Sequence, residues 1–306
     1  MRVLLIAGGW SNEREVSLSG AAKIHDALAR LGCKVTRLDP AERFDDILAL
    51  ASEADFAFIN MHGMPGEDGL VQALLEQADC PYQGSGPKAS FLALNKAAAK
   101  QVFARAGIPT PRWEYLPGRP KAGWATKLGF PLFVKPNMGG SSLDLCRVAR
   151  AEDLAPTMER IFARGETVLL EEAVHGQEVT SAILGEEALP LILIRPSDSA
   201  FFDYRCKYTP GGAEEICPAP IPENVARRVR DLALRAHKAL GLRGYSRADF
   251  MLAGDSPFIL EVNTLPGMTP TSLVPQAARE AGLDFDALIR RLMDLGLEAR
   301  GRGPKG

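Results

Sequence analysis

The spacing of apolar residues in the first part of the chain, residues 1–86, predicts a parallel α/β unit. RVLLIAGG is a continuous apolar run typical of a buried parallel strand, and CKVTRLD and ADFAFINMHG predict a second and a third strand. After the first run, Ile24, Leu28 and Leu31 share one helical stripe that Gly32 ends, and DGLVQALLEQA predicts another helix. Ligands of such units collect beyond the carboxyl ends of the strands, where the loops GGWSNEREVS and NMHGMPGEDG lie.

In the middle part, residues 87–174, the pattern predicts a helix followed by strands. Pro87 opens the helix and Gly107 closes it. The residues expected on its apolar face are Phe91, Leu94, Ala98 and Val102. The strand FPLFVKP carries Lys135 into NMGGSS, whose glycines free the backbone to wrap an anion, although an ordinary turn is the alternative. TVLLEEAV predicts a further strand that ends in Glu171-Glu172.

The last part, residues 175–306, predicts two hairpins and two helices. QEVTSAILGEEALPLILIRP is typical of a hairpin that turns at residues 185–187. Residues 196–220 lack a clear periodicity, and a loop of this length inside a compact domain is usually either a functional lid or disordered. The aromatic residues of this stretch favour an ordered lid. A helix is expected over residues 222–240, and a final helix contains Leu283, Leu288 and Leu292.

The second hairpin, RADFMLAGDSPFILEVN, carries polar residues inside strongly apolar strands. Side chains alternate along a strand, so Arg247 and Asp249 share one face, as do Glu261 and Asn263. If the turn centres on Asp255, Asp249 lies opposite Glu261 and Arg247 opposite Asn263. Two carboxylates and an amide suit Mg²⁺, and the arginine could stabilise developing negative charge. The alternative is an ordinary hairpin with a solvated polar face.

Composition narrows the class of protein. The chain has 306 residues, with 36 basic and 38 acidic side chains and a net charge of −2, which predicts no nucleic-acid or membrane partner. Its five cysteines include no C-x-x-C pair, and its beginning does not resemble a signal peptide. Free thiols of this kind are expected in a reducing cytoplasm.

Several single residues have both a plain and a functional interpretation. Glu13 could complement a helix dipole or hold an ammonium group, and His62 is more often structural than functional. Lys96 could be a solvated lysine, whereas Lys135 directly before a glycine-rich loop favours phosphate binding. The chain contains neither G-x-G-x-x-G nor the Walker A pattern, which excludes a dinucleotide fingerprint and a P-loop.

Taken together and in order, these segments resemble the D-alanine–D-alanine ligase family of the ATP-grasp superfamily. The matching segments span nearly the whole chain: GGWSNEREVSLSG, MHGMPGEDG, YQGSG, VKPNMGGSS, LLEEAVHGQEVTSAILG, FFDYRCKY, CPAP, GYSRADFM and EVNTLPGMTPTSLVP. The resemblance implies three domains, 1–86, 87–174 and 175–306, of α/β class with α+β character in the ATP-grasp part. ATP would lie between the second and third domains.

The resemblance also implies the reaction. ATP would phosphorylate the carboxylate of one D-alanine, and the amine of a second would attack the acyl phosphate. D-alanyl-D-alanine for peptidoglycan precursors, ADP and phosphate would result. D-lactate or D-serine as second substrate, and a catalytically silent nucleotide-binding protein, are the alternatives. The family further implies a cytoplasmic homodimer.

Residue roles follow from the matching positions. ATP would be contacted by Lys96, Lys135, Ser142, Glu171, Glu178 and Lys207, and two Mg²⁺ or Mn²⁺ ions by Asp249, Glu261 and Asn263. The first D-alanine's ammonium would bind Glu13, with His62 nearby, and the second's carboxylate would bind Ser272 and the Leu273 N–H. Arg247 and the Gly267 N–H would form an oxyanion hole, and Ser141 and Tyr208 would close the site through hydrogen bonds to Glu13.

The phosphate loop departs from the family pattern. After Ser141-Ser142 the family usually has an aliphatic residue and then glycine, whereas this chain has Leu143-Asp144. A non-glycine residue loses access to positive φ, and the carboxylate would stand beside the triphosphate. We therefore expect weaker ATP binding than in a relative with glycine at position 144.

Overall fold

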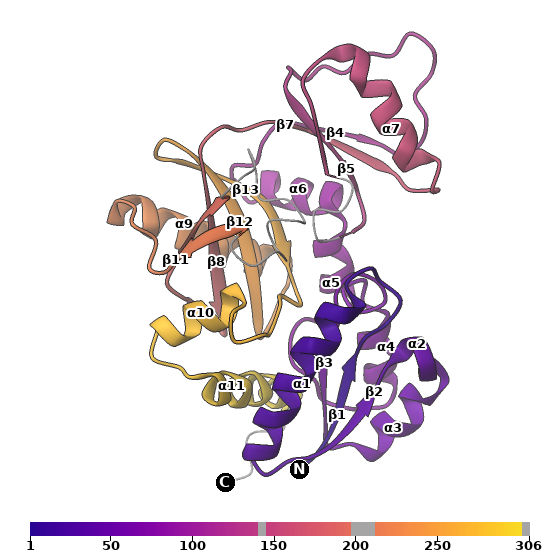
Figure 1. Cartoon of the computed structure of the whole chain (residues 1–306), viewed down its shortest axis with the longest axis vertical. Helices are drawn as coiled ribbons and strands as arrows, with labels where there is room; N and C mark the ends of the chain where they lie inside the picture. Colours follow the sequence, from indigo (N-terminus) through magenta and orange to yellow (C-terminus); the bar gives the residue numbers. More distant parts are fainter. Residues whose placement is uncertain (140–144, 197–211, 302–306) are drawn as a thin grey trace.

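The computed structural model describes residues 1–139, 145–196 and 212–301. It arranges them around three β-sheets along the longest axis of the molecule (Figure 1). The sheet formed by the first strands lies at one end and the sheet of the middle part at the other. The largest sheet lies between them, beside the helices α5 and α6.

The first sheet is parallel throughout, as the apolar runs predict. Its order is β2-β1-β3, with bounds β1 (Arg2–Ala7), β2 (Lys34–Leu38) and β3 (Phe56–Asn60). Its helical segments are α1 (Arg14–Arg30), α2 (Pro40–Arg43), η1 (Phe44–Asp46), α3 (Ile47–Glu53) and α4 (Leu70–Gln77). Every residue of β3 is buried, which is why the run is apolar without alternation.

The single helix predicted from Pro87 to Gly107 is wrong, because two helices occupy this segment. They are α5 (Pro87–Leu94) and α6 (Lys96–Arg105). Asn95 between them has ψ 94°, outside the helical region, and its side chain accepts a hydrogen bond from the Ala98 N–H to cap α6. Because of the break, the residues predicted to form one apolar face do not all face the core. Phe91 is 51% exposed, while Lys96 is buried.

The middle sheet is antiparallel, with the order β4-β7-β5-β6. Its elements are β4 (Trp113–Leu116), β5 (Leu132–Pro136), β6 (Cys146–Val148), η2 (Ala151–Asp153), α7 (Leu154–Phe162) and β7 (Val168–Glu172). The buried face of α7, including Met158 and Ile161, packs with Leu132, Val134 and Leu170 in a core of its own.

The last sheet is also antiparallel and runs β11-β10-β8-β12-β13, with β9 beside β8. Its elements are β8 (Gln177–Leu184), β9 (Glu187–Ala188), β10 (Ile192–Pro196), β11 (Ala213–Ile216), α9 (Glu223–Ala239), β12 (Tyr245–Ala253) and β13 (Ser256–Asn263). The hairpin predicted at residues 185–187 is confirmed by the pairing of β8 with β9 and β10. Strand β11, by contrast, lies in the stretch 196–220, where no regular element was predicted.

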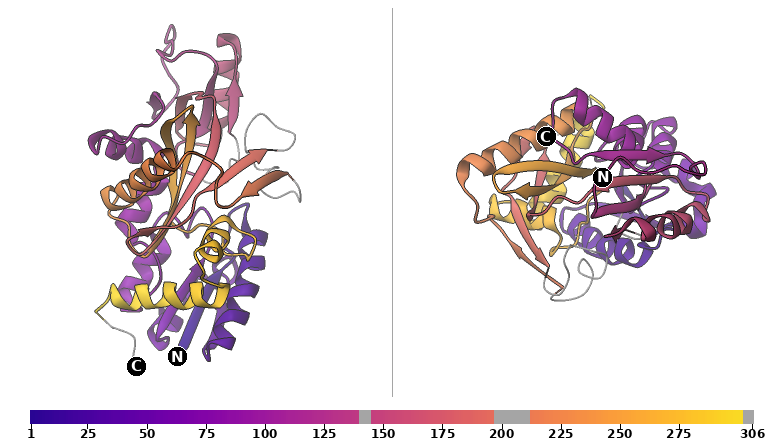
Figure 2. Two further views of the ribbon diagram at one scale, coloured as in Figure 1. Left: turned by 90° about the vertical axis from the view of Figure 1, so that its left-hand side faces the viewer. Right: turned by 90° about the horizontal axis from the view of Figure 1, so that it is seen from above.

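Of the C-terminal helices, α11 (Phe285–Glu298) packs against α1 and β3 of the first unit, whereas α10 (Leu273–Glu280) packs against α11 and β8. Arg30 of α1 forms a bidentate ion pair with Asp286 of α11, and both N–O distances are 2.6 Å. Gly296 lies so close to Tyr82 that an added Cβ would stand 2.5 Å from the Tyr82 carbonyl oxygen. Two views at right angles place α11 beside the first sheet unit (Figure 2).

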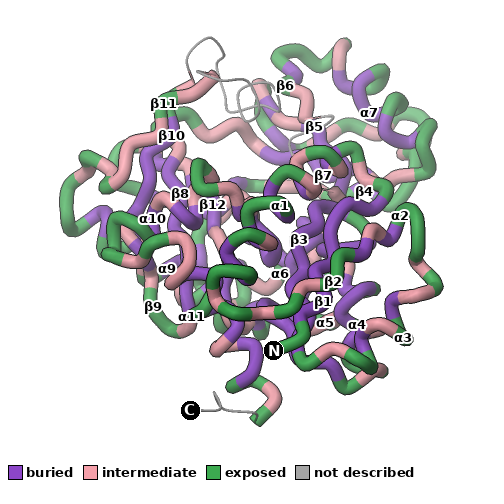
Figure 3. Tube along the Cα trace, turned by 60° about the horizontal axis from the view of Figure 1, so that its bottom comes forward, coloured by how far each residue is buried: buried purple, intermediate pink, exposed green. Residues whose placement is uncertain are grey.

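The buried backbone follows β1 and β3 of the first sheet and the central strands β8 and β12 of the last sheet (Figure 3). Within the described ranges, the helices lack the combination of length and apolar character that a membrane crossing requires. The division of the chain at residues 86 and 174 stays a prediction.

Candidate active site

The hairpin of β12 and β13 brings the four predicted polar residues together. Asp249 pairs with Glu261 and Arg247 with Asn263, which confirms the predicted facing pairs. The assumed centre of the turn is wrong, however. Ala253 pairs with Ser256 across a two-residue turn, and this register continues to Phe250 and Ile259. Continued further, it would place Asp249 opposite Leu260 rather than Glu261.

A shift of register beside Asp249 restores the polar pairing. Ile259 and Val262 both lie in the apolar core, although residues three apart in a regular strand point to opposite faces. One extra residue in β13 therefore acts as a β-bulge. It turns Glu261 and Asn263 to the face that Arg247 and Asp249 occupy.

Asp249 is the most heavily hydrogen-bonded member of this face. Arg247 donates to it through Nε at 2.8 Å and Nη2 at 2.7 Å. Asn263 Nδ2 donates at 3.0 Å, and Thr180 Oγ1 donates from β8 at 2.8 Å. The residue is only 6% exposed, so these donors stabilise a carboxylate that burial would otherwise destabilise.

The donor set fits a nucleotide-bound divalent cation rather than a closed protein metal site. In the described part of the chain, no three His, Cys, Asp or Glu side chains are grouped to hold a metal ion. Asp249, Glu261 and Asn263 supply two carboxylates and an amide. Mg²⁺ is commonly held by one or two carboxylates with phosphate oxygens and water as the other ligands, so the residues present fit that ion.

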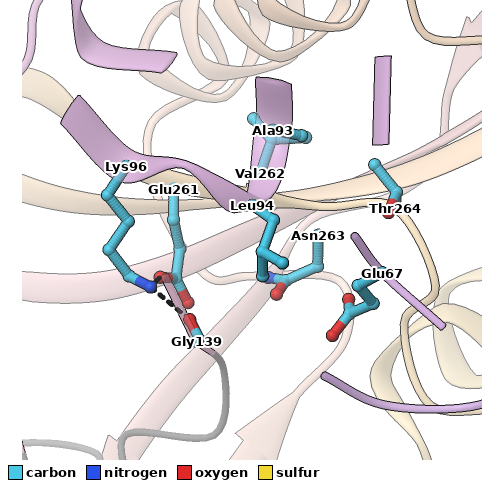
Figure 4. Close-up of a pocket in the computed structure, with 9 residues that line it drawn as sticks. All are labelled: Glu67, Ala93, Leu94, Lys96, Gly139, Glu261, Val262, Asn263 and Thr264. Atoms are coloured by element: carbon cyan, nitrogen blue, oxygen red, sulfur yellow. Dashed lines mark hydrogen bonds and ion pairs between the residues drawn. The ribbon is translucent and has the colours of Figure 1, made fainter. Parts of the chain in front are cut away.

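Lysines from the middle part of the chain approach this acidic face. Lys96 Nζ lies 3.9 Å from Glu261 Oε2 and also donates to the Gly139 carbonyl (Figure 4). Burial lowers the pKa of Lys96, and Glu261 counteracts part of that effect. Lys135 Nζ donates to Glu171 Oε1 at 2.7 Å. Burial works against the charge of Glu171, but the lysines around it outweigh burial and hold its pKa below the usual value.

A small cavity that is partly open to solvent lies where the two groups meet. Its lining comes from the first, middle and last parts of the chain: Glu67, Ala93, Leu94, Lys96, Gly139, Glu261, Val262, Asn263 and Thr264 (Figure 4). Glu67 was not predicted as a site residue. Burial raises its pKa to about 7, against a hydrogen bond of 2.7 Å from the Gly63 N–H. In sequence, the acid of MPGEDG is indistinguishable from a solvated loop residue.

Glu13 and His62 occupy the carboxyl-end loops of the first sheet, as predicted, and are 6% and 8% exposed. Burial lowers the pKa of His62, which the charge of Glu13 partly offsets. His62 is hydrogen-bonded to the backbone of Leu265, just beyond β13, and the charge of Arg247 also acts on it. His62 therefore links the first sheet unit to the end of the β12–β13 hairpin.

Gly267 and Ser272 lie in the loop before α10 and approach each other closely. A Cβ on Gly267 would stand 2.9 Å from Ser272 Oγ, so only glycine fits without a shift. Ser272 Oγ accepts from the Thr269 N–H at 3.1 Å. Leu273 is the first residue of α10, and backbone N–H groups at a helix start favour anions.

Glu178 lies on β8 two residues before Thr180, so both project to the face that carries Asp249. Six residues discussed from the sequence lie outside the described ranges: Ser141, Ser142, Leu143, Asp144, Lys207 and Tyr208. Lys100, which pairs with Glu171, was not singled out in the sequence either. As a lysine of an amphipathic helix, it could not be told from a solvated residue.

Known proteins match this arrangement over its full length. The model of the D-ala D-ala ligase C-terminus family matches residues 102–294. A D-alanine–D-alanine ligase of Nitratidesulfovibrio vulgaris is 62% identical over 303 residues, which cover 99% of this chain and 100% of that protein. The ligase of Oleidesulfovibrio alaskensis is 60% identical, with 99% and 98% covered. The chain belongs to the D-alanine–D-alanine ligase family.

A solved structure of the same family supports the architecture. The crystal structure of the D-alanine–D-alanine ligase of Bacillus anthracis complexed with ATP is 33% identical and has a TM-score of 0.88. The match covers 98% of this chain and 99% of the Bacillus anthracis chain. The predicted resemblance and the predicted α/β, ATP-grasp fold class are thereby confirmed.

Proposed function

We propose that this ligase-family enzyme uses ATP to join two D-alanine molecules into D-alanyl-D-alanine. The observation that carries the proposal is the meeting of a lysine group and an acidic face at one cavity. Lys96 lies 3.9 Å from Glu261, so a phosphate chain bound by the lysines would reach the side chains suited to hold its cation. D-alanine is proposed as the substrate because the relatives are named D-alanine–D-alanine ligases.

In the first step, the carboxylate oxygen of one D-alanine attacks the γ-phosphorus of ATP, and the bond to the β-phosphate oxygen breaks to release ADP. Lys96 and Lys135 would bind and orient the phosphates, with Ser142 and Lys207 assisting by family position. Asp249, Glu261 and Asn263 would hold two Mg²⁺ or Mn²⁺ ions, which neutralise phosphate charge when bound. Glu171 and Glu178 would hold the adenine and ribose regions.

In the second step, the amine of the other D-alanine attacks the acyl carbon and loses a proton. The tetrahedral intermediate then expels phosphate and leaves the peptide bond. Arg247 and the Gly267 N–H would stabilise the oxyanion of that intermediate. Each substrate is held by its own group of residues, with Glu13 and His62 on the first ammonium and Ser272 and the Leu273 N–H on the second carboxylate. Ser141 and Tyr208 would close the site.

Product identification by mass spectrometry tests the activity. The protein is incubated with ATP, Mg²⁺ and D-alanine, and we expect a product with the mass of D-alanyl-D-alanine and one ADP per dipeptide. L-alanine and a reaction without amino acid are the controls. Absence of the dipeptide would overturn the proposal. Faster ADP release when D-lactate or D-serine is added as second substrate would reassign its specificity.

We further propose that the enzyme acts in the cytoplasm as a homodimer in peptidoglycan precursor synthesis. The nucleotide requirement and the free cysteines of the described chain suit a reducing compartment that contains ATP. Sedimentation equilibrium at micromolar concentration tests the assembly, and a mass near the 33.0 kDa of one chain would exclude the dimer.

A further inference from the structure

Lys100 lies near the proposed ATP site but does not line its cavity. Lys100, on the second turn of α6, has no exposed surface and is among the largest fully buried side chains. A buried ammonium is costly unless it is paired and hydrogen-bonded. Its Nζ forms an ion pair with Glu171 Oε2 and donates to Thr110 Oγ1 at 2.6 Å. Burial lowers the pKa of Lys100 to about 8, while Glu171 opposes that change.

Glu171 is shared between this lysine and one that faces phosphate. Its Oε1 accepts from Lys135 at 2.7 Å, and its Oε2 pairs with Lys100. Two lysines and one glutamate leave a net charge of +1. Without Lys100, Glu171 and Lys135 would form a neutral pair, and the carboxylate would hold the Lys135 ammonium more strongly. The charge that Lys135 presents to phosphate therefore depends on a side chain behind it.

The same lysine is tied to the metal-binding hairpin through Thr110. Thr110 Oγ1 donates to the Ile259 carbonyl at 2.8 Å, and the Ile259 N–H donates to the Pro109 carbonyl at 2.8 Å. Ile259 is the last residue of β13 in the first register, directly before the bulge that orients Glu261. Lys100 thus connects the sheet that carries Lys135 with the strand that carries Glu261.

We propose that Lys100 is a positioning residue for ATP: it holds Glu171 so that Lys135 stays oriented and net positive, and it fixes the phosphate-binding sheet to the metal-binding hairpin. This inference rests on the proposed use of ATP. Lys100 itself does not line the cavity, and it acts through Glu171 and Thr110.

The test is the affinity for Mg²⁺-ATP, measured by calorimetry without amino acid, together with steady-state kinetics. We expect Lys100→Met to weaken ATP binding by about 10- to 50-fold, the scale of one unit charge acting over several ångströms inside a protein. The KM for D-alanine should change less than about twofold, because Lys100 does not contact that part of the site. Lys88→Met, on the neighbouring α5, is the control and should bind ATP as the wild type does.

A double variant separates positioning from general damage. Because Glu171→Gln already neutralises the shared carboxylate, adding Lys100→Met to it should weaken ATP binding by no more than about two- to fivefold, the part that Thr110 carries, against about 10- to 50-fold in the wild-type background. A loss of folded protein would lower the maximal rate and leave KM unchanged. Unchanged ATP affinity in Lys100→Met, or an equal loss in both backgrounds, would overturn the inference.

Thr110→Val tests the second connection and remains informative if Lys100→Met does not fold. It keeps the Lys100–Glu171 pair and removes the Thr110 hydroxyl, which accepts from Lys100 and donates to the Ile259 carbonyl. ATP binding should therefore weaken by about two- to fivefold, the scale of a hydrogen bond. Unchanged affinity would remove the link to the hairpin from the proposal. Because ATP binding is measured without amino acid, these outcomes stay distinct from a failure of the wild type to make the dipeptide.

Discussion

The lysine cluster (Lys96, Lys100, Lys135 and Glu171) and the hairpin face (Arg247, Asp249, Glu261 and Asn263) meet at one cavity and are built in opposite ways. Each contains one group of the opposite charge that organises the others, Glu171 among the lysines and Arg247 among the acids. Part of the lysine cluster is fully buried, since the Lys100 and Glu171 side chains are 0% and 4% exposed. The hairpin face stays more open, with the Glu261 side chain 25% exposed.

The difference reflects how each group meets its ligand. Residues of the hairpin face lie on the open side of a ribbon, and ligand oxygens must complete the coordination of any cation they hold. The lysine cluster keeps a net positive charge, because Glu171 balances only one of its three lysines. We expect phosphate to balance the rest through Lys96 and Lys135. Substitutions should therefore act on turnover at the hairpin face and on ATP affinity at the lysine cluster.

The largest effect is expected at Asp249. Asp249→Asn should lower kcat by about 10³-fold or more, because a weakened cation site loses several kcal/mol of charge stabilisation in the transition state. Asp255→Asn, at the exposed turn of the same hairpin, is the matched control and should retain normal kcat. Turnover of Asp249→Asn within tenfold of the wild type at saturating Mg²⁺ would contradict its assignment as a metal ligand.

Arg247→Ala should lower kcat by about 10²- to 10³-fold and leave ATP affinity largely intact, the loss typical of one oxyanion donor. Steady-state kinetics and calorimetry with Mg²⁺-ATP separate the two quantities. Arg228→Ala, an exposed arginine on α9, is the control. Near-normal turnover would remove Arg247 from the mechanism. A large loss of ATP affinity would instead mean that its main task is to hold Asp249.

The free energy of unfolding should depend on pH through His237, which is hydrogen-bonded to β12 of the hairpin. Its Nδ1 lies 2.7 Å from Ser246 Oγ, and burial lowers its pKa to about 4. The unfolded chain takes up this proton near pH 6.5, so protonation favours unfolding between these values. The free energy of unfolding should fall by about 2 kcal/mol from pH 7 to pH 5 through this group.

Urea unfolding at both pH values measures that fall. His237→Gln removes the titration and should reduce the pH dependence by the same amount. The control is His25→Gln, whose side chain is 40% exposed on α1 and which should leave the dependence unchanged. An identical pH dependence in His237→Gln and the wild type would show that His237 does not titrate in this window.

The smallest effect is expected at Asp144, in the phosphate loop. Asp144→Gly should lower the KM for ATP by about two- to fivefold, because it removes the carboxylate that the family position would put beside the triphosphate and makes positive φ accessible. Asp144→Asn separates the two causes, since it removes the charge and keeps the side chain. An unchanged or higher KM in Asp144→Gly would refute the expectation of weakened ATP binding.

Much of the fold was predictable because its signals are local. The unbroken apolar runs of the first sheet, the helical stripe ended by Gly32 and the hairpin at residues 185–187 all follow from side-chain periodicity and turn residues. The break at Asn95 was missed, because an asparagine within a helical pattern differs from a cap only in its backbone conformation. That break decides which residues of α6 are buried.

The sequence by itself determined the composition of the site and the family, because the polar residues interrupt apolar strands and the motifs follow one order along the chain. Tertiary structure decided how those residues meet. The pairing of Asp249 with Glu261 needs a bulge beyond a two-residue turn, and no local pattern marks the extra residue. Glu67 lines the cavity and Lys100 pairs with Glu171 only because each is buried beside groups distant in sequence, since burial is what makes a charge depend on its partners.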